Sequence, residues 1–453
     1  MGRKIAVIGG GPSGMMAAIQ AAKQNPENRV ILLEKNDTPG KKLLLTGNGK
    51  CNYSNTNMDS THYNENAKEI TKQVLKEFTP EDLCLFFAEN GMLSSNKSGL
   101  LYPYSGQART VLNTLMLLLK DLHVTIVSNA NVYGLQTIKE GDSDKYIVEY
   151  EEKTSLLSEP AIGKCKEAKN KRKEAVFVEK GNTKIHKERF DSVILCCGGK
   201  AYPKTGSDGS GFKLARNLGI FVSNTYPVLV KLNSDFNKSK KLSGIRTKAK
   251  VSAVLYDKSG QPEILSDALG ELQIVDSGIS GINVFQISRA LSKPLEEHQK
   301  CEVWIDYLPD FDGESIYEFI EQSKILNQTH TLQQFFGGIL CEKLTEFYLK
   351  RFFDNPHMPV SSYPKEQLIQ FMMELKCIKI PIQSHNGYNE AQATRGGVSC
   401  LEINSHLESV LHKNLYFAGE MVDVDGECGG YNLHWAFASG YVAGTHCGSE
   451  RKE

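Results

Sequence analysis

The chain has 453 residues, and its 53 Lys plus Arg balance 53 Asp plus Glu. A balanced charge gives no general attraction to nucleic acid or to an anionic membrane, so neither is expected as a partner. The expected partner is a small-molecule substrate. No apolar run reaches the roughly 18 residues that cross a bilayer, and no signal peptide precedes the first strand, so the expected location is the cytoplasm. The length predicts two or three domains and leaves the oligomeric state open.

The cysteine pattern predicts reduced thiols. The chain has 11 cysteines, none of them in a C-x-x-C pair, and Cys196 and Cys197 are adjacent in an apolar run. This spacing suits neither a disulfide framework nor a zinc site, so no metal is expected.

A glycine turn follows the first apolar segment. Residues 5–8 suit a strand buried on both faces, and Gly9, Gly11 and Gly14 follow at G-x-G-x-x-G spacing before a predicted helix over 15–23. Gly9 allows the tight turn, Gly11 lacks a Cβ where a pyrophosphate would lie, and Gly14 allows close helix packing. The N–H groups at the helix start would face the anion.

A carboxylate ends the second predicted strand. Residues 29–34 are apolar up to Glu34, which comes 20 residues after Gly14. An acidic residue at this place accepts hydrogen bonds from the ribose hydroxyls of an adenosine. The structural alternative, an ordinary βαβ unit with a chance glycine turn, stays open.

Residues 37–52 are rich in glycine and lysine and are predicted as a loop. Gly47, Gly49 and Lys42 suit further contact with the pyrophosphate or with the ring system beyond it. A surface loop with solvated lysines is the alternative. Cys51 is predicted as a packing thiol, because no histidine lies near it in sequence to activate it.

The next part of the chain is predicted as helical over 66–122, with a turn around 94–106. Strands are predicted over 124–127, 130–136 and 145–150.

The stretch 151–188 is rich in lysine and glutamate. Its cluster at 164–173 is predicted to belong to a solvated β-hairpin tip rather than to an RNA-binding or membrane-binding patch, because glutamates interrupt the lysines.

A further buried strand, 190–197, ends in Gly198 and Gly199. The glycine pair again lets the backbone pass close to a ligand. A helix over 212–218 follows the glycine-rich segment 205–211.

The pattern then changes twice. Short alternating segments over 228–287 are typical of an antiparallel barrel or sandwich, and helical spacing over 313–375 places its aromatic residues in a core. The predicted domains are residues 1–223 with 384–453, a β-barrel-like insert 224–309 and a helical insert 310–383.

The C-terminal part suits a flavin. A predicted strand over 415–420 ends in glycine and Glu420, and Gly429 and Gly430 begin a helix near Asn432. Glu420 could accept a hydrogen bond from ribitol, while the helix start could direct N–H groups at the flavin N1 and C2 carbonyl. Because of these features, FAD, bound non-covalently, fits better than NAD. No second G-x-G-x-x-G motif occurs, so no separate dinucleotide-fold domain for nicotinamide is predicted. The alternative is a strand and helix that merely close the sheet.

Five segments together resemble a bacterial flavoprotein family of NAD(P)/FAD-dependent oxidoreductases. They are G-G-G-P-S-G (9–14), P-G-K-K-L-L-L-T-G-N-G-K-C-N (39–52), G-G-K-A-Y-P-K-T-G-S (198–207), G-I-S-G (278–281) and F-A-G-E-M-V-D-V-D-G-E-C-G-G-Y-N (417–432). The family includes enzymes described as aminoacetone oxidases and reductases of conjugated 3-oxo bile acids.

The resemblance implies an α/β fold, in which a two-dinucleotide-type, Rossmann-like FAD domain is interrupted by a β-barrel insert and a small helical insert. In such flavoproteins the residue near Val132 meets the adenine through its backbone. Together, the motifs and the resemblance place these residues at the FAD: Gly9, Gly11, Pro12, Ser13, Gly14, Glu34, Lys35, Lys42, Thr46, Gly47, Gly49, Cys51, Asn52, Val132, Gly198, Gly199, Gly419, Glu420, Gly430, Tyr431 and Asn432.

Three departures from the family pattern affect the substrate more than the cofactor, and one of them is an expanded lysine-rich stretch at 151–188. The chain has T-G-S-D-G-S-G-F at 205–212, where T-G-S-T-G-D-G-Y is expected, and V-D-S at 275–277 in place of a Thr-His-aromatic run.

The leading expectation is an NAD(P)H-dependent reductase of a C=C or C=O bond in an apolar molecule such as a 3-oxo bile acid or steroid. An amine or aminoketone oxidase and a flavin-dependent RNA-binding or regulatory protein are the alternatives. Tyr431, His434 and His385 are candidate proton donors by residue type, with a structural role as the alternative for each.

Overall fold

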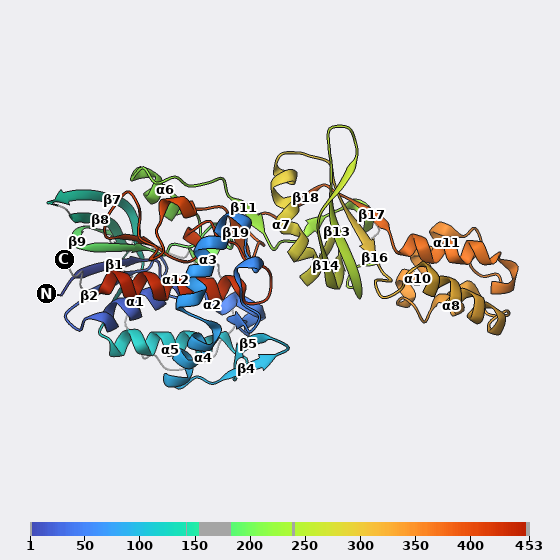
Figure 1. Ribbon diagram of the computed structural model, residues 1–453, viewed down its shortest axis with the longest axis horizontal. Coiled ribbons are helices and arrows are strands. Elements are labelled where there is room, and N and C mark those ends of the chain that lie inside the picture. Colours follow the sequence, from blue (N-terminus) through green and yellow to red (C-terminus); the bar gives the residue numbers. More distant parts are fainter. Residues whose placement is uncertain (1, 142, 154–182, 238–240, 450–453) are drawn as a thin grey trace, which may run out of the picture. The chain divides into compact units, whose positions relative to one another are not determined.

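The computed structural model describes residues 2–141, 143–153, 183–237 and 241–449 (Figure 1). The cluster predicted at 164–173 and the tip of its hairpin lie outside these residues. Contacts divide the chain into two compact units. The first comprises Met1–Gly199, Lys204–Ser223 and Gly396–Glu453, and the second comprises Lys200–Pro203 and Asn224–Arg395.

A parallel five-stranded sheet forms the centre of the first unit. Its strands, in spatial order, are β20 (Leu415–Phe417), β10 (Ser192–Leu195), β1 (Lys4–Ile8), β2 (Arg29–Leu33) and β6 (Thr125–Val127). The chain passes from β1 to β2 on one side and later returns to β10 on the other, so the order reverses beside β1. Ligands of open parallel sheets bind at such a reversal, outside the carboxyl ends of the strands.

The helices of the first unit surround this sheet and its two smaller neighbours. The helices are α1 (Pro12–Gln24), α2 (Lys41–Leu45), α3 (Lys68–Glu77), α4 (Pro80–Glu89), α5 (Ala108–Asp121), α6 (Ser210–Asn217) and α12 (Tyr431–Gly448). The smaller sheets are antiparallel, with the strands β7 (Ala130–Glu140), β8 (Ser143–Lys153) and β9 (Thr183–Phe190) in one and β3 (Ser54–Asn55), β5 (Leu100–Pro103) and β4 (Ser94–Lys97) in the other.

Helices α1 and α12, from opposite ends of the chain, pack side by side (Figure 1). Gly440, Gly444 and Gly448 lie four residues apart on α12, and a Cβ on each would come 2.3–2.7 Å from a backbone oxygen of α1. Small residues at this spacing let the two backbones approach closely. Replacing any of them would push the two helices apart.

Three predictions of local structure in the first unit need correction. The predicted loop 37–52 contains helix α2, because Leu43 is fully buried and anchors a helical turn. The predicted turn around 94–106 is the hairpin β4–β5, which forms because β5 pairs with the distant strand β3. The predicted strand 190–197 is two strands, since the chain turns at Asp191, whose carboxylate accepts from the Lys4 N–H and from Lys145.

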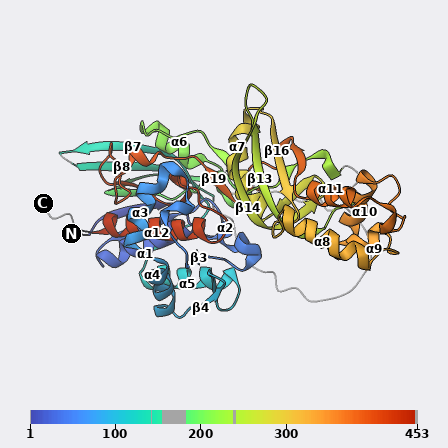
Figure 2. The ribbon, with the colours of Figure 1, turned by 45° about the vertical axis from the view of Figure 1, so that its right-hand side comes forward.

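The second unit is built on an antiparallel seven-stranded sheet (Figure 2). Its strands, in spatial order, are β17 (Ile378–Ile382), β16 (Cys301–Asp306), β13 (Arg246–Tyr256), β14 (Pro262–Val275), β15 (Gly278–Gly281), β12 (Leu232–Asn233) and β18 (Ser384–His385). A separate pair consists of β11 (Tyr226–Val228) and β19 (Ala393–Arg395).

The helices of the second unit share one core with this sheet. They are α7 (Ile282–Glu296), α8 (Gly313–Leu326), α9 (Leu332–Phe336), α10 (Glu342–Phe352) and α11 (Lys365–Leu375). Helix α7 begins inside the region predicted as β, because Ile287, Leu291 and their neighbours bury a helical face. The prediction that the aromatic residues around 332–347 form a core is confirmed for Phe335 and Phe336, which are buried.

The predicted α/β class is therefore confirmed, with a Rossmann-like parallel sheet and added antiparallel and helical parts. Among the helices of the described ranges, none has the length and apolarity that a membrane crossing requires.

Candidate functional site

The glycine turn after β1 has the geometry of a phosphate cradle. A Cβ at Gly9 would lie 2.4 Å from the Cys196 carbonyl oxygen, and one at Gly14 would lie 1.8 Å from the Gly9 carbonyl oxygen, so packing requires both glycines. A Cβ at Gly11 would meet nothing within 4 Å. Gly11 is the N-cap of α1, where no side chain caps the first turn. The turn thus leaves open space in front of helix N–H groups that no described side chain caps, as an anion site needs.

Glu34 lies at the predicted place, directly after β2. It is 7% exposed, and its Oε2 accepts from the Gly10 N–H at 2.6 Å. Its Oε1 accepts from the Asn36 N–H at 2.8 Å and from the Asn36 side-chain amide at 2.7 Å. The carboxylate therefore joins the glycine turn to the end of β2, and contact with a ribose stays a prediction.

A second group of predicted residues meets where β10 and β20 end. Lys42 and the Gly199 N–H donate to Glu420 Oε2 at 2.8 and 3.1 Å. A Cβ at Gly198 would lie 2.6 Å from Ser207 Oγ. Ser207 is 6% exposed, and its hydroxyl has no hydrogen-bond partner in the described part of the chain. A buried hydroxyl without a partner favours a site that a ligand completes.

The start of α12 is held by the segment around β3. In the orientation that satisfies its hydrogen bonds, the Asn52 amide accepts from the Gly430 N–H at 3.1 Å and donates to the Ser54 carbonyl at 2.8 Å. The Asn55 amide donates to the Gly429 carbonyl at 2.9 Å. Residues from the second and fifth of the five motifs quoted above thus meet at the N-terminus of α12, the longest described helix.

The two ends of the proposed cofactor site belong to the same unit and touch. A Cβ at Gly419, where φ is +69°, would lie 2.5 Å from Ser13 Oγ. The Gly419 carbonyl accepts from the Trp435 indole N–H at 3.0 Å. The glycine turn and the segment that begins at Gly419, both predicted to bind the same FAD, are therefore neighbours, and their contact with FAD stays a prediction.

Tyr431 lies in an aromatic and acidic cluster. Its ring stacks on His62 with centroids 4.4 Å apart, and the Tyr63 hydroxyl donates to its carbonyl at 3.0 Å. His62 Nδ1 lies 3.0 Å from Glu427 Oε2. Burial, and then the Glu427 carboxylate, raise the pKa of the Tyr431 phenol to about 12, so it stays protonated at neutral pH.

His434 is fully buried and bonded at both ring nitrogens. Ser54 Oγ lies 2.9 Å from Nδ1, and the Phe78 carbonyl oxygen lies 3.3 Å from Nε2. Because a carbonyl can only accept, Nε2 carries the hydrogen and Nδ1 accepts from the serine hydroxyl. Burial lowers the pKa of the ring to about 4. A neutral ring held in this way favours a structural role.

This geometry predicts a pH-dependent contribution to stability. His434→Phe should destabilise the protein by about 2–4 kcal/mol at pH 7.5, because it leaves the Ser54 hydroxyl and the Phe78 carbonyl unpaired. The folded pKa lies below the usual 6.5, so the stabilisation is present above pH 6.5 and is lost as the pH falls toward 4.

The difference between wild type and His434→Phe should therefore shrink by about 2 kcal/mol between pH 7.5 and 5. Urea unfolding at the two pH values measures it. The exposed His357→Gln serves as the control and should show no such change. A difference that stays constant with pH would show that the ring does not titrate as described.

His385 belongs to the second unit. Its Nε2 lies 3.1 Å from Glu296 Oε1, and its Nδ1 accepts from the Gly387 N–H at 3.1 Å. Burial lowers its pKa, against the opposing effect of Glu296. Its part in catalysis stays a prediction.

The remaining predicted residues have simpler environments. Thr46, Gly47 and Gly49 form a short 3-10 turn after α2, and the two glycines are exposed. Cys51 is fully buried, which raises the pKa of its thiol to about 12, so it is no thiolate nucleophile. Lys35 is exposed and forms an ion pair with Asp208. Val132 is buried in β7, next to a bulge.

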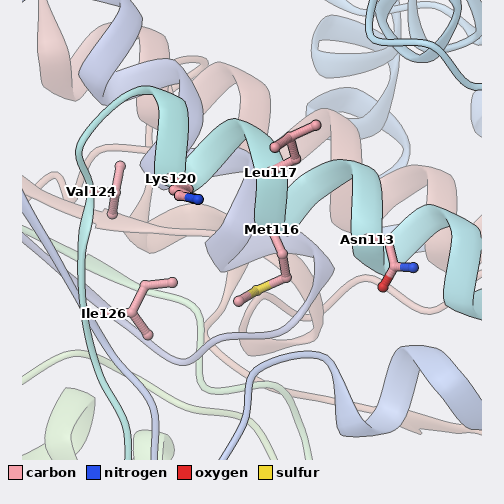
Figure 3. Close-up of a pocket in the computed structure, with 6 residues that line it drawn as sticks. All are labelled: Asn113, Met116, Leu117, Lys120, Val124 and Ile126. Atoms are coloured by element: carbon pink, nitrogen blue, oxygen red, sulfur yellow. The ribbon is translucent and has the colours of Figure 1, made fainter.

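An open hollow of about 510 Å³ lies elsewhere in the first unit, between α5 and β6 (Figure 3). Its lining is mostly apolar, and the lining residues include none of the predicted site residues: Asn113, Met116, Leu117, Lys120, Val124 and Ile126. The hollow is therefore no part of the predicted cofactor site.

Sequence reasoning missed His62, Asn55 and Ser207. Ser207 ends a motif that the sequence analysis quoted, so a small polar residue after two glycines was its available signal. His62 and Asn55 had none, since the contacts that bring them to the start of α12, with Glu427 and Gly429, join residues more than 360 positions apart.

The chain matches the family model "HI0933-like protein Rossmann domain" over residues 3–162 and 162–446. It is 36% identical over 444 residues to the 3-dehydro-bile acid delta(4,6)-reductase of Clostridium scindens, which covers 97% of this chain and 98% of the relative. It is 26% identical, over 96% of each chain, to the ribosomal RNA dihydrouridine synthase of Haemophilus influenzae, and 24% identical, over 96% of each, to that of Escherichia coli.

Solved structures resemble the chain more distantly. The 3-ketosteroid-delta4-(5alpha)-dehydrogenase of Rhodococcus jostii RHA1 has a TM-score of 0.47 and 14% identity, covering 99% of this chain and 97% of that chain. The 3-ketosteroid delta1-dehydrogenase of Sterolibacterium denitrificans has a TM-score of 0.49 and 11% identity, covering 98% and 99%. Likeness at this level says nothing about the substrate.

These matches confirm the predicted family resemblance and the prediction of an enzyme of the flavin-dependent oxidoreductase class. The family and the open cradle at Gly11 support FAD as the cofactor, whereas NAD(P)H stays a prediction. The chain belongs to the HI0933-like family of Rossmann-domain proteins.

Proposed function

We propose that this protein is a FAD-dependent reductase that uses NAD(P)H to saturate the C=C bond of an α,β-unsaturated ketone in an apolar, steroid-like molecule. In the overall reaction, a hydride adds to the β carbon and a proton adds to the α carbon. One NAD(P)H is thereby oxidised for each saturated ketone formed. A cytoplasmic location is part of the proposal.

The observation that carries this proposal is the contact of the glycine turn with the segment after β20, through Ser13 and Gly419, in the same unit as the start of α12. The uncapped start of α1 and the helix N-terminus of α12 support one extended site for an anionic cofactor. The substrate class is supported by the bile-acid reductase of C. scindens, with which the chain aligns over nearly its full length.

We propose that the residues named from the sequence hold FAD in two groups. Gly11, Ser13 and Glu34 would hold the adenosine and pyrophosphate half, and Glu420 and the α12 start would hold the ribitol and ring. A bound flavin supplies hydride transfer. The rest of residues 1–223 and 384–453 would form the FAD domain, with 224–309 and 310–383 as inserts.

We propose Tyr431 as the proton donor among the three candidates. Its phenol is neutral at pH 7, and stacking on His62 fixes its ring. His62 donates to Glu427 through Nδ1, so the imidazole holds one orientation against the phenol ring. His434, by contrast, has both ring nitrogens bonded inside the core.

A second candidate function is reduction of uridine in RNA. Two relatives that align with 96% of this chain are named ribosomal RNA dihydrouridine synthases. The uracil C5=C6 bond is conjugated to a carbonyl, so the chemistry is related. The balanced charge of the chain favours the small-molecule substrate, because RNA binding depends strongly on basic residues.

Anaerobic stopped-flow reduction, followed at the flavin absorbance, tests the proposal. NADH or NADPH should bleach the flavin, and a 3-oxo-Δ4 steroid should then restore its absorbance faster than oxygen does. Restoration by ribosomal RNA, with dihydrouridine formed and no steroid turnover, would favour the second candidate.

The same experiment separates the oxidase alternative. Bleaching by aminoacetone, with peroxide formed on admission of oxygen and no bleaching by either pyridine nucleotide, would overturn the reductase proposal. A protein that stays colourless after FAD is added would overturn all three readings.

A further inference from the structure

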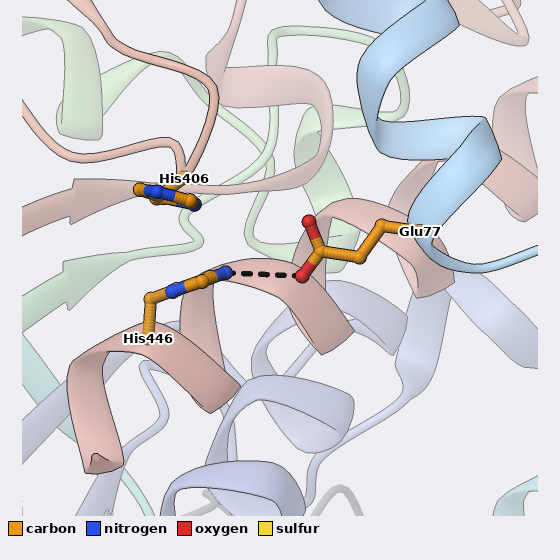
Figure 4. A group of neighbouring side chains, drawn as sticks. All are labelled: Glu77, His406 and His446. Carbon is orange, nitrogen blue, oxygen red and sulfur yellow. Dashed lines mark hydrogen bonds and ion pairs between the residues drawn. The ribbon is translucent and has the colours of Figure 1, made fainter.

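Two histidines and a glutamate from three separate segments meet on the surface of the first unit (Figure 4). Glu77 is the last residue of α3, His446 lies in the last turn of α12, and His406 lies in the loop before β20. His446 Nε2 is 3.0 Å from Glu77 Oε1, and the imidazole centroids are 3.8 Å apart. One ligand atom from each of the three residues lies within 4.8 Å of the others.

The backbones that carry these side chains are held in place. Phe78 and Tyr441 stack with centroids 4.2 Å apart and join the end of α3 to α12. In the loop, Asn404 Oδ1 accepts from the His406 N–H at 2.9 Å, and the adjacent Leu407 is fully buried. The three side chains therefore need only rotate to reach one common point.

The donor set suits a borderline-soft divalent cation. Imidazole nitrogen and carboxylate oxygen are ordinary Zn²⁺ ligands at about 2.0–2.2 Å, which places tetrahedral ligand atoms roughly 3.3 Å apart. Each of the three side chains offers one such ligand atom.

We propose that Glu77, His406 and His446 form a Zn²⁺-type divalent metal site, with the fourth position left to water. The site joins the C-terminal ends of α3 and α12 to the 404–407 loop. Because α12 rises about 1.5 Å per residue, the site lies roughly 22 Å from Tyr431 along the helix. The metal therefore acts on the stability of the first unit and not on the chemistry proposed above.

Chelator-treated full-length protein, with FAD bound, is titrated with ZnCl₂ at pH 7.5 by calorimetry and with CoCl₂ by visible absorption. One equivalent of Zn²⁺ should bind, Co²⁺ should give the intense bands of tetrahedral coordination, and excess Zn²⁺ should raise Tm by about 2–4 °C. His406→Gln and His446→Gln should each weaken binding by about 100-fold or more.

The exposed His357→Gln is the matched control and should bind as the wild type does. Equal Tm values of the wild type and the variants without metal would show that the variants fold. The cobalt bands of the wild type test the metal site without relying on any variant. Absence of binding at micromolar Zn²⁺, or unchanged affinity in the double His variant, would overturn the proposal. The rate of steroid reduction should be unchanged in these variants. The metal site and the proposed function can therefore fail independently of each other.

Discussion

Replacing Gly11 by alanine should lower the affinity for FAD by about 10- to 100-fold and leave the fold intact. The added Cβ would meet no protein atom within 4 Å, and the backbone at Gly11, with φ −76° and ψ −177°, is one that any residue adopts. The methyl group would instead occupy the space in front of the α1 N–H groups, where the pyrophosphate is proposed to lie.

FAD affinity is measured by titrating the apoprotein with FAD and following flavin fluorescence. The Tm of the apoprotein is measured in parallel to show that the fold is intact. Gly313→Ala is the matched control, because it also adds a methyl group in open space at the start of a helix. Gly14→Ala should behave oppositely and impair folding, since its Cβ would lie 1.8 Å from the Gly9 carbonyl oxygen. Wild-type FAD affinity in Gly11→Ala would refute the placement of the pyrophosphate.

Tyr431→Phe should slow the reaction of the reduced enzyme with the unsaturated ketone by about 100-fold or more, the usual effect of losing a general acid. Reduction of the flavin by NAD(P)H should be unchanged, because that step needs no proton from the phenol. The phenyl ring keeps the stacking on His62 and the aromatic contact with Tyr63, so the fold should be preserved.

Stopped-flow measurement of the two half-reactions, with a solvent isotope effect on the second, checks this expectation. Tyr63→Phe is the control: its buried hydroxyl donates to the Tyr431 carbonyl, so its loss should cost stability and leave the second half-reaction nearly unaltered. If Tyr431→Phe reduces the ketone at the wild-type rate and with the wild-type isotope effect, another group supplies the proton.

Much of the first unit could be predicted because its signals are local. The apolar run before Gly9, the glycine spacing and the carboxylate after β2 each lie within a few residues of the structure that they specify. The close packing at Gly9 and Gly14 and the position of Glu34 agree with that reading. Predictions were less accurate where the secondary structure depends on strands that pair over a long sequence distance. The hairpin β4–β5 is an example, because its strand β5 pairs with β3.

The G-x-G-x-x-G turn, the change from β to helical pattern after residue 224 and the family motifs are all readable from residue order, because backbone preferences and hydrophobic periods act over short distances. The partners of His62 and His434, the orphan Ser207 hydroxyl and the Glu77–His406–His446 cluster are not readable in this way. They arise where segments far apart in the sequence pack together, as α12 does against α1 and α3, and such contacts depend on side-chain volumes across the whole core rather than on any neighbouring residue.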